Sequence, residues 1–191
     1  MRKIVFIFFI LISKLFLSQN LCFNTTNYYE FKFCSSPQTL FLIEKKNNKY
    51  EGFIITNLEK ERKNKAYKQI KRKTKISPEQ AKRIIYKLKK AEINLVDKNY
   101  DDDSVVYLDG DYLTINLLRN DKIEKFSFDE IYPISYKKRE KTPLRSKIQE
   151  WLTIINEELN LKKQLTKIKN KLNKGTYCYS HGINTICFKK E

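Results

Sequence analysis

The stretch TLFLIEKKNNKYEGFIIT, residues 39–56, places two runs of large apolar residues on either side of Asn47-Asn48. Apolar, β-branched and aromatic residues favour β-strands, and asparagine tolerates the positive φ angles that tight hairpin turns require. The pattern therefore predicts strands over 39–46 and 49–56. A two-residue turn would align large side chains across the hairpin on one face of the sheet, pairing Leu42 with Phe53 and Leu40 with Ile55.

The sequence before this hairpin predicts a further strand. YYEFKFC, residues 28–34, is rich in aromatic residues, and the turn-forming SSPQ follows at 35–38. Short aromatic runs bounded by serine and proline are typical of strands and their turns. Residues 28–56 are therefore expected to form a three-stranded antiparallel meander.

The segment ISPEQAKRIIYKLKKAEI has the clearest helix signals in the chain. Ser77 is a good N-cap, Pro78 stands at the first helical position, and Gln80 completes a capping box. Apolar residues then recur at helical spacing. The pattern predicts a helix over 78–91 with its apolar face formed by Ile84, Ile85, Leu88 and Ala91.

A second meander is predicted farther along the chain. SVVYL (104–108) and YLTINLL (112–118) flank Asp109-Gly110, which is a strong hairpin signal. KIEKFSF (122–128) then returns through Asn120-Asp121. This return pairs Ile115 with Phe126 and Leu113 with Phe128.

The apolar positions after Thr142-Pro143 predict a long C-terminal helix. Their phase shifts near Asn160, which predicts a bend there, and Gly175 is placed to end the helix. Trp151 lies in the middle of the stripe and is expected to be buried against the sheet. The stripe comprises Leu144, Ile148, Trp151, Leu152, Ile155 and Leu159, then Leu161, Leu165, Ile168 and Leu172.

Two meanders, each followed by a helix, predict an α+β domain. We expect an antiparallel sheet from the two β-meanders, two helices packed on one face, and a C-terminal β-hairpin. The alternative is a small β-barrel with an appended helix.

The first residues, MRKIVFIFFILISKLFLSQ, have the form of a secretory signal peptide. Arg2 and Lys3 precede nine apolar residues, which are too few to span a bilayer, since a spanning helix needs about 20. We therefore expect residues 1–19 to be a signal peptide and residues 20–191 to be a single domain. The expected location is secreted or periplasmic.

The C-terminal sequence CYSHGINTIC, residues 178–187, predicts a disulfide-linked hairpin. A type II′ turn at Gly182-Ile183 makes Cys178 face Cys187 at a non-hydrogen-bonded position, where Cα atoms lie about 4.5 Å apart. That separation suits a disulfide, and an exported protein meets oxidants that allow one. The alternative is a zinc site that includes His181, the only histidine, but it lacks a fourth nearby ligand.

The two other cysteines, Cys22 and Cys34, are expected to bond to each other by nearest-neighbour pairing, although four cysteines allow three connectivities. No metal ion or other cofactor is expected.

The excess of basic residues, 39 Lys plus Arg against 22 Asp plus Glu, indicates a role for anionic partners. However, 32 of the basic residues are Lys and 7 are Arg, whereas phosphate and base recognition favour the arginine fork. An exported protein, moreover, seldom meets nucleic acid. We therefore expect a solvated lysine surface and no nucleic-acid partner.

The most basic segment, LEKERKNKAYKQIKRKTKI at 58–76, contains nine basic and two acidic residues. A charged edge strand or exposed loop has this composition, because charges on a sheet edge prevent aggregation. The functional alternative is an anionic surface held by interleaved basic and aromatic side chains. The contacts of that alternative would be Lys63, Lys65, Lys68, Lys71, Arg72 and Lys73.

The acidic segment YDDDSVVYLDGD, residues 100–111, does not fit the EF-hand pattern, and Asp109 is explained by a turn. The chain also has no Gly-x-Ser-x-Gly motif and no glycine-rich phosphate loop. We therefore expect a non-enzymatic exported domain, of the binding or inhibitor type, that acts on a protein or envelope component. The alternative is a polyanion or membrane-surface binder acting through residues 58–76, and an enzyme ranks third.

Overall fold

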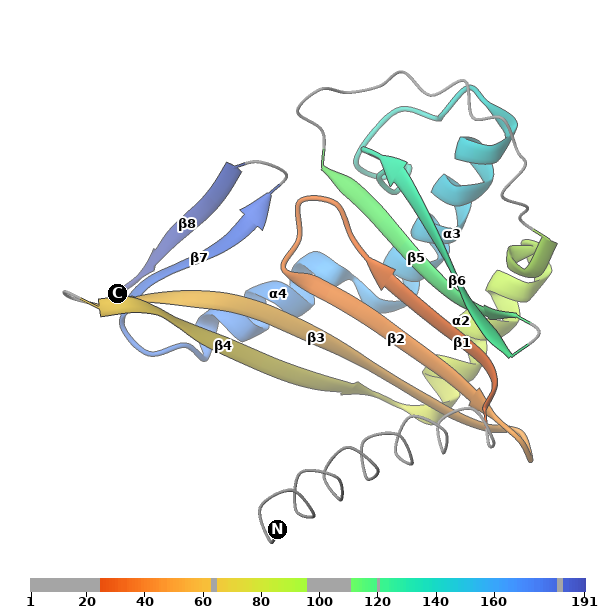
Figure 1. Ribbon diagram of the computed structural model, residues 1–191, viewed down its shortest axis with the longest axis horizontal. Helices are drawn as coiled ribbons and strands as arrows, with labels where there is room; N and C mark the ends of the chain where they lie inside the picture. Colours follow the sequence, from red (N-terminus) through yellow and green to blue (C-terminus); the bar gives the residue numbers. More distant parts are fainter. Residues whose placement is uncertain (1–24, 63–64, 96–110, 120, 182–183) are drawn as a thin grey trace, which may run out of the picture.

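The computed structural model describes residues 25–62, 65–95, 111–119, 121–181 and 184–191. In this part of the chain, eight strands form one antiparallel sheet (Figure 1). The strand order is β6-β5-β1-β2-β3-β7-β8, and β4 pairs with the opposite edge of β3. The strands are β1 (Thr25–Lys32), β2 (Gln38–Lys45), β3 (Lys49–Arg62), β4 (Lys65–Ile76), β5 (Tyr112–Arg119), β6 (Lys122–Asp129), β7 (Gly175–His181) and β8 (Asn184–Lys190).

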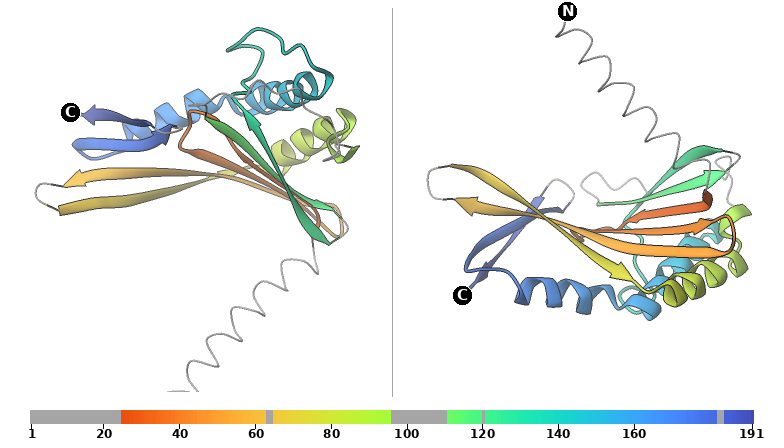
Figure 2. Two further views of the ribbon diagram at one scale, coloured as in Figure 1. Left: turned by 45° about the horizontal axis from the view of Figure 1, so that its top comes forward. Right: turned by 90° about the horizontal axis from the view of Figure 1, so that it is seen from below.

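The sheet curls into the shape of half a barrel, and the helices lie together on one side of it (Figure 2). The described helices are α2 (Pro78–Lys90), α3 (Pro143–Leu159) and α4 (Leu161–Asn170), with a short 3-10 turn, η1 (Ile93–Leu95), after α2. An antiparallel sheet combined with helices was expected. The curvature of the sheet is also compatible with the barrel alternative. Within the described residues, no helix has the length and apolar character needed to cross a bilayer.

The meander of β1, β2 and β3 is confirmed, but the register of its second hairpin was predicted wrongly. The turn includes Lys46 as well as Asn47 and Asn48, whose φ angles are 73° and 56°. Because a third residue enters the turn, every cross-strand partner shifts by one position. Leu40 therefore faces Ile54, and Leu42 faces Gly52.

This shift turns Phe53 and Ile55 away from the core that contains Leu40. Phe53 instead stacks on Phe41 on the other face of the sheet, with ring centroids 4.8 Å apart. Gly52 takes the inward position, where a Cβ atom would lie 3.2 Å from the Cβ of Ala81 on α2. The register thus places the smallest residue of β3 where Ala81 of α2 packs tightly against the sheet.

The hairpin of β5 and β6 has the predicted register, with Ile115 opposite Phe126 and Leu113 opposite Phe128. The predicted strand 104–108 and its turn at Asp109-Gly110 lie outside the described residues. On its other edge, β5 pairs with β1 through residues 114–117, and this pairing joins the two halves of the sheet.

The predicted helix after Ser77 is confirmed as α2. The Ser77 hydroxyl accepts a hydrogen bond from the backbone N–H of Gln80, 3.2 Å away. The amide nitrogen of the Gln80 side chain donates a hydrogen bond to the backbone carbonyl of Glu158 at 2.6 Å. Gln80 therefore connects the start of α2 to the end of α3.

The predicted bend at Asn160 is confirmed as a break between α3 and α4. Asn160 has a φ angle of 47°, and its side chain caps α4 by accepting from the N–H of Lys163 at 3.0 Å. The predicted helix end at Gly175 was wrong. The helix ends at Asn170, and Gly175, at φ 143°, begins β7 where the side chain of Lys60 packs against it.

Two apolar cores are present in the described structure. The larger lies between the sheet and the helices and includes Trp151, which is 1% exposed as expected. The smaller is formed by Leu58, Leu172 and Tyr177 where β7 leaves the sheet. β7 pairs with β3 only at Glu59 and Lys60, so the C-terminal hairpin is an extension of the domain that is held against β3 mainly by the smaller core.

Candidate functional site

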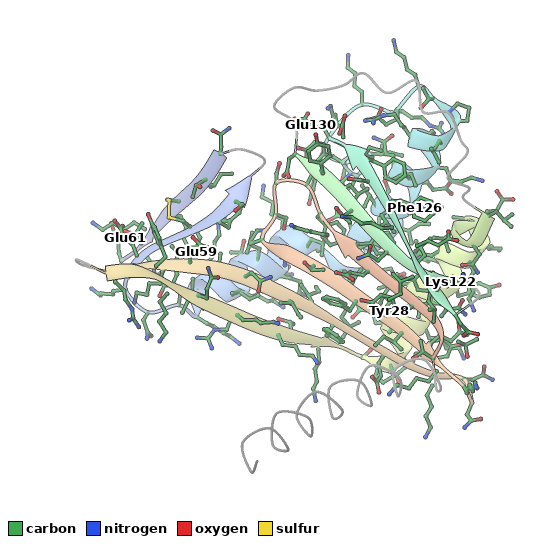
Figure 3. The ribbon with its side chains drawn as sticks, in the orientation of Figure 1. Tyr28, Glu59, Glu61, Lys122, Phe126 and Glu130 are labelled. Atoms are coloured by element: carbon green, nitrogen blue, oxygen red, sulfur yellow. A yellow bond between two sulfur atoms is a disulfide. The ribbon has the colours of Figure 1, made fainter. Side chains whose placement is uncertain are left out.

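The C-terminal hairpin has the predicted pairing and the predicted disulfide. Cys178 faces Cys187, and their sulfur atoms are bonded with the Cα atoms 4.1 Å apart (Figure 3). The side chain of His181 and the turn at 182–183 lie outside the description. No group of three or more metal-ligating side chains is found within the described ranges.

The other two cysteines do not meet in the part of the chain that the structure describes. Cys34 is a buried free thiol, and Cys22 lies outside the described residues. The Cys22–Cys34 bond therefore stays a prediction.

The basic segment forms a charged edge strand, as expected, because β4 pairs with β3 alone among the described strands. The structure does not gather on one surface the four candidate polyanion contacts whose side chains it describes. Lys68 and Arg72 alternate with Lys71 and Lys73 and so point to opposite faces of the sheet. Lys63 and the side chain of Lys65 lie outside the description.

Lys73 illustrates this separation. Its ammonium lies 3.8 Å from the ring centroid of Phe53, on the face of the sheet away from the helices. A cation held over an aromatic face gains a favourable interaction with the ring. Lys73 therefore covers Phe53 on the open face of the sheet.

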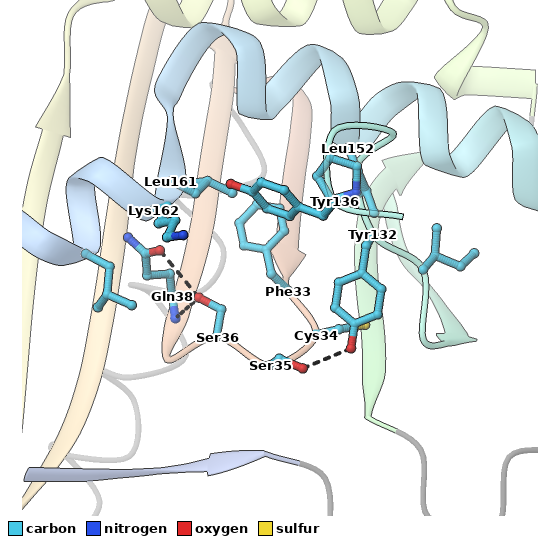
Figure 4. A pocket seen from close by; sticks show the side chains of 13 residues that line it. Phe33, Cys34, Ser35, Ser36, Gln38, Tyr132, Tyr136, Leu152, Leu161 and Lys162 are labelled. Atoms are coloured by element: carbon cyan, nitrogen blue, oxygen red, sulfur yellow. Dashed lines mark hydrogen bonds between the residues drawn. The ribbon is translucent and has the colours of Figure 1, made fainter. Parts of the chain in front are cut away.

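A cavity of about 210 Å³ lies where the β1–β2 turn meets the junction of α3 and α4 (Figure 4). Three separate parts of the chain form it: residues 33–38, residues 131–136, and the helix residues Leu152, Leu161, Lys162 and Leu165. Its apolar wall comes mainly from Phe33, Ile131, Pro133, Leu152, Leu161 and Leu165.

The most unusual polar group of the cavity is the side chain of Gln38, which is 1% exposed. Its oxygen accepts a hydrogen bond from the Ser36 hydroxyl at 3.4 Å (Figure 4). Its Nε2 has no hydrogen-bond partner among the described residues. A buried amide N–H without an acceptor destabilises the folded state, so a ligand that supplies an acceptor would bind with an advantage.

The opposite end of the cavity is bordered by neutral hydrogen-bonding groups. The hydroxyls of Ser35 and Tyr132 are 2.9 Å apart, and burial raises the pKa of Tyr132. Burial, with the nearby Asp111 charge, also raises the pKa of the Cys34 thiol to about 12. Cys34 is therefore a protonated thiol near neutral pH, which is a poor nucleophile.

Asp111 belongs to the acidic segment, and its carboxylate has a structural role. It accepts hydrogen bonds from the backbone N–H of Ser35 and, at 2.9 Å, from that of Tyr112. These bonds attach the β1–β2 turn to the start of β5. The other members of the segment, Asp101, Asp102, Asp103 and Asp109, lie outside the described residues.

The loop that closes the cavity is held by a second buried glutamine, Gln149 on α3. Its amide donates to the carbonyls of Tyr132 and Lys138 at 3.1 and 3.0 Å, and its oxygen accepts from the N–H of Glu140 at 2.9 Å. The cavity wall is therefore positioned before any ligand binds.

Apart from Cys34, which was expected in a disulfide, the sequence indicated none of the lining residues as a site, because the lining comes from segments about 15 to 130 residues apart. One signal was present. In the inward-facing alternation Gln38, Leu40, Leu42, a glutamine stands where an apolar residue is expected. Comparison with protein-family models, curated proteins and solved structures finds no match to the chain.

Proposed function

We propose that this protein is an exported, non-enzymatic binding domain whose cavity at the α3–α4 junction receives one apolar group of a macromolecular or envelope partner. The observation that supports this proposal most is the unpartnered amide nitrogen of Gln38 in a mainly apolar cavity. Specific sites typically combine an apolar lining with a few such polar groups.

The size of the cavity sets the size of the group. An apolar cavity of about 150 Å³ is large enough to bind benzene. A cavity of about 210 Å³ therefore accommodates an aromatic ring or a branched aliphatic group, but not a long acyl chain. The group needs a hydrogen-bond acceptor at one end, opposite Gln38.

The chemistry of the lining favours binding over catalysis. The 13 lining residues include no carboxylate and no histidine, and the thiol among them is held protonated. General acid–base catalysis needs a group that titrates near the working pH. Export is supported by the form of residues 1–19 and by the Cys178–Cys187 disulfide, which is typical of oxidising compartments.

Small aromatic molecules test the proposal directly. Phenol and benzoate provide a ring with an oxygen at one end, whereas toluene provides the ring alone. We expect phenol and benzoate to bind at about millimolar concentrations, and toluene to bind more weakly. Chemical shifts of methyl groups of Leu152, Leu161 and Leu165 would report the location.

Two tryptophan variants, one that fills the cavity and one that does not, provide a matched comparison. Leu165 is half-buried on α4, so Leu165→Trp can place its ring in the cavity without disturbing the central core. Thr166→Trp makes the same change at an exposed position of the same helix. Binding should be lost in Leu165→Trp and kept in Thr166→Trp. Equal binding by both variants would contradict the proposal.

A further inference from the structure

The two elements β4 and α4 concentrate positive charge to a degree not found in the rest of the described structure. Six of the twelve residues of β4 are Lys or Arg, and four of the ten residues of α4 are Lys. Neither element contains an acidic residue. Surfaces that serve only solubility usually mix both signs of charge, because like charges repel one another.

A groove of about 520 Å³ lies between these two elements. Arg72, Lys73 and Thr74 border it from β4, and Gln164, Lys167 and Ile168 border it from α4. The ammonium of Lys73 itself lies over the ring of Phe53 on the opposite face of the sheet, so it does not enter the groove. Lys171, directly after α4, completes the described lining. The groove shares no lining residue with the apolar cavity.

Among the described residues, the cations of this groove lack the carboxylate partners that several other basic residues have. On the neighbouring helix α2, Lys87 pairs with Glu158 at 2.7 Å, and Lys89 pairs with Glu44 at 2.5 Å. Among the residues that the structure describes, no carboxylate lies within ion-pair distance of Arg72, Lys167 or Lys171. Their charges are thus available to an external anion.

Acidic residues do occur on the adjacent strand β3, but none of them lines the groove. Glu59 and Glu61 lie towards the far end of β3 (Figure 3), and Glu59 accepts a hydrogen bond from Gln69 at 2.6 Å. Glu59 and Gln69 are cross-strand partners on the face opposite to Leu58 and Ile70. Glu59 therefore does not neutralise the positive charge of the groove.

The shape and lining of the groove indicate the type of anion. A flat bilayer would contact the most protruding residues rather than the space between a strand and a helix. Single-stranded nucleic acid is usually held by stacking on aromatic side chains, and the described lining contains none. An arginine fork, two ammonium groups, a hydroxyl and an amide suit tetrahedral oxyanions on a flexible, non-aromatic chain.

We propose that the groove between β4 and α4 binds a polyanionic glycan, through phosphate or sulfate groups held by Arg72, Lys167 and Lys171. The expected anionic partner of residues 58–76 would then contact one face of β4 together with α4. This site is separate from the proposed function of the cavity.

Calorimetric titration of the full chain with dextran sulfate and with phosphomannan tests the proposal and distinguishes sulfate from phosphate. Neutral dextran is the uncharged control. The groove variant is Arg72→Gln/Lys167→Gln/Lys171→Gln. Its matched control, Lys46→Gln/Lys49→Gln/Lys122→Gln, removes the same charge from exposed positions outside the groove.

We expect at least one of the two polyanions to bind about 100-fold more weakly to the groove variant, and only a few-fold more weakly to the control variant. The dependence of log K on log salt should also become shallower by about two units in the groove variant. Equal losses in the two variants would show that net charge alone attracts the glycan and would overturn the proposal. Binding only to single-stranded DNA or to phosphatidylglycerol vesicles would overturn it as well.

Discussion

The indole nitrogen of Trp151, in the middle of α3, donates a 2.8 Å hydrogen bond to the carbonyl oxygen of Ala91, the C-cap residue of α2. Carbonyls at the end of a helix have no partner within the helix, so this bond satisfies one of them. The same side chain fills the larger core. Trp151 therefore joins two helices by both packing and hydrogen bonding.

Two substitutions of Trp151 should separate these contributions. Trp151→Ala removes the ring and should lower the free energy of unfolding by about 3–5 kcal/mol. Trp151→Phe keeps much of the packing but leaves the Ala91 carbonyl unpaired, so it should cost about 1–3 kcal/mol. Urea unfolding followed by circular dichroism measures both. Native fluorescence typical of a water-exposed tryptophan would contradict the packing, since Trp151 is the only tryptophan.

The Cys178–Cys187 disulfide should stabilise the C-terminal hairpin specifically. The closed loop is short, with a sequence separation of 9, so the loop-entropy model gives about 2–3 kcal/mol. In Cys178→Ser/Cys187→Ser, amide hydrogen exchange should accelerate in β7 and β8. Exchange in β1, β2 and β5 should change little, because β7 pairs with the main sheet at only two positions, both on β3.

Non-reducing peptide mapping is the direct check of this bond, and it should recover residues 178 and 187 in one linked fragment. Cys34→Ala provides a control for the loss of a cysteine outside the hairpin. Acceleration of exchange throughout the sheet in the hairpin variant would show that the hairpin is not an extension but part of the central fold.

Short-range signals in the sequence correctly predicted the features that depend only on residues close together in the chain. Ser77 and Pro78 marked the start of α2, and the phase shift at Asn160 marked the break between α3 and α4. Both depend on backbone geometry within a few residues. The pairing of β7 with β8 was similar, because the two bonded cysteines are only nine residues apart.

The register of β2 and β3 was not predictable in this way. Asn47-Asn48 suits a two-residue turn, and the choice of a three-residue turn places Gly52 beneath Ala81 of α2. The packing of a helix that begins more than twenty residues later therefore decides the register. The cavity could not be predicted for the same reason. Gln38 becomes part of a cavity only because Tyr132 and Leu161, which are distant in the sequence, also line it.

Glu158 should make stability depend on pH. It forms ion pairs with Lys87 and Arg83, and the hydrogen bond from Lys87, opposed by burial, lowers the pKa of the Glu158 carboxyl below 4.5. A carboxyl with a lowered folded-state pKa stabilises the fold above its unfolded pKa. That stability is lost as pH falls below about 4.5 through the folded value.

Glu158→Gln should therefore lower the free energy of unfolding by about 1 kcal/mol at pH 7 and by much less at pH 2. Urea unfolding at the two pH values measures the difference. Glu150→Gln is the matched control, because Glu150 lies on the same helix but is exposed. A difference that is the same at pH 7 and pH 2 would show that the charge of Glu158 does not stabilise the contact with α2.

The two buried glutamines should respond in opposite directions to the same substitution. Gln38→Leu removes an amide whose Nε2 has no partner among the described residues, and it should raise the free energy of unfolding by about 1 kcal/mol. The same variant should bind phenol and benzoate more weakly, because the ligand oxygen loses its donor.

Gln149→Leu removes three hydrogen bonds and should lower the free energy of unfolding by about 3 kcal/mol. A residue that costs stability in the free protein and adds affinity for a ligand is expected at a binding site. If Gln38→Leu destabilises the protein as Gln149→Leu does, then Gln38 is a structural residue and its amide does not serve ligand binding in the cavity.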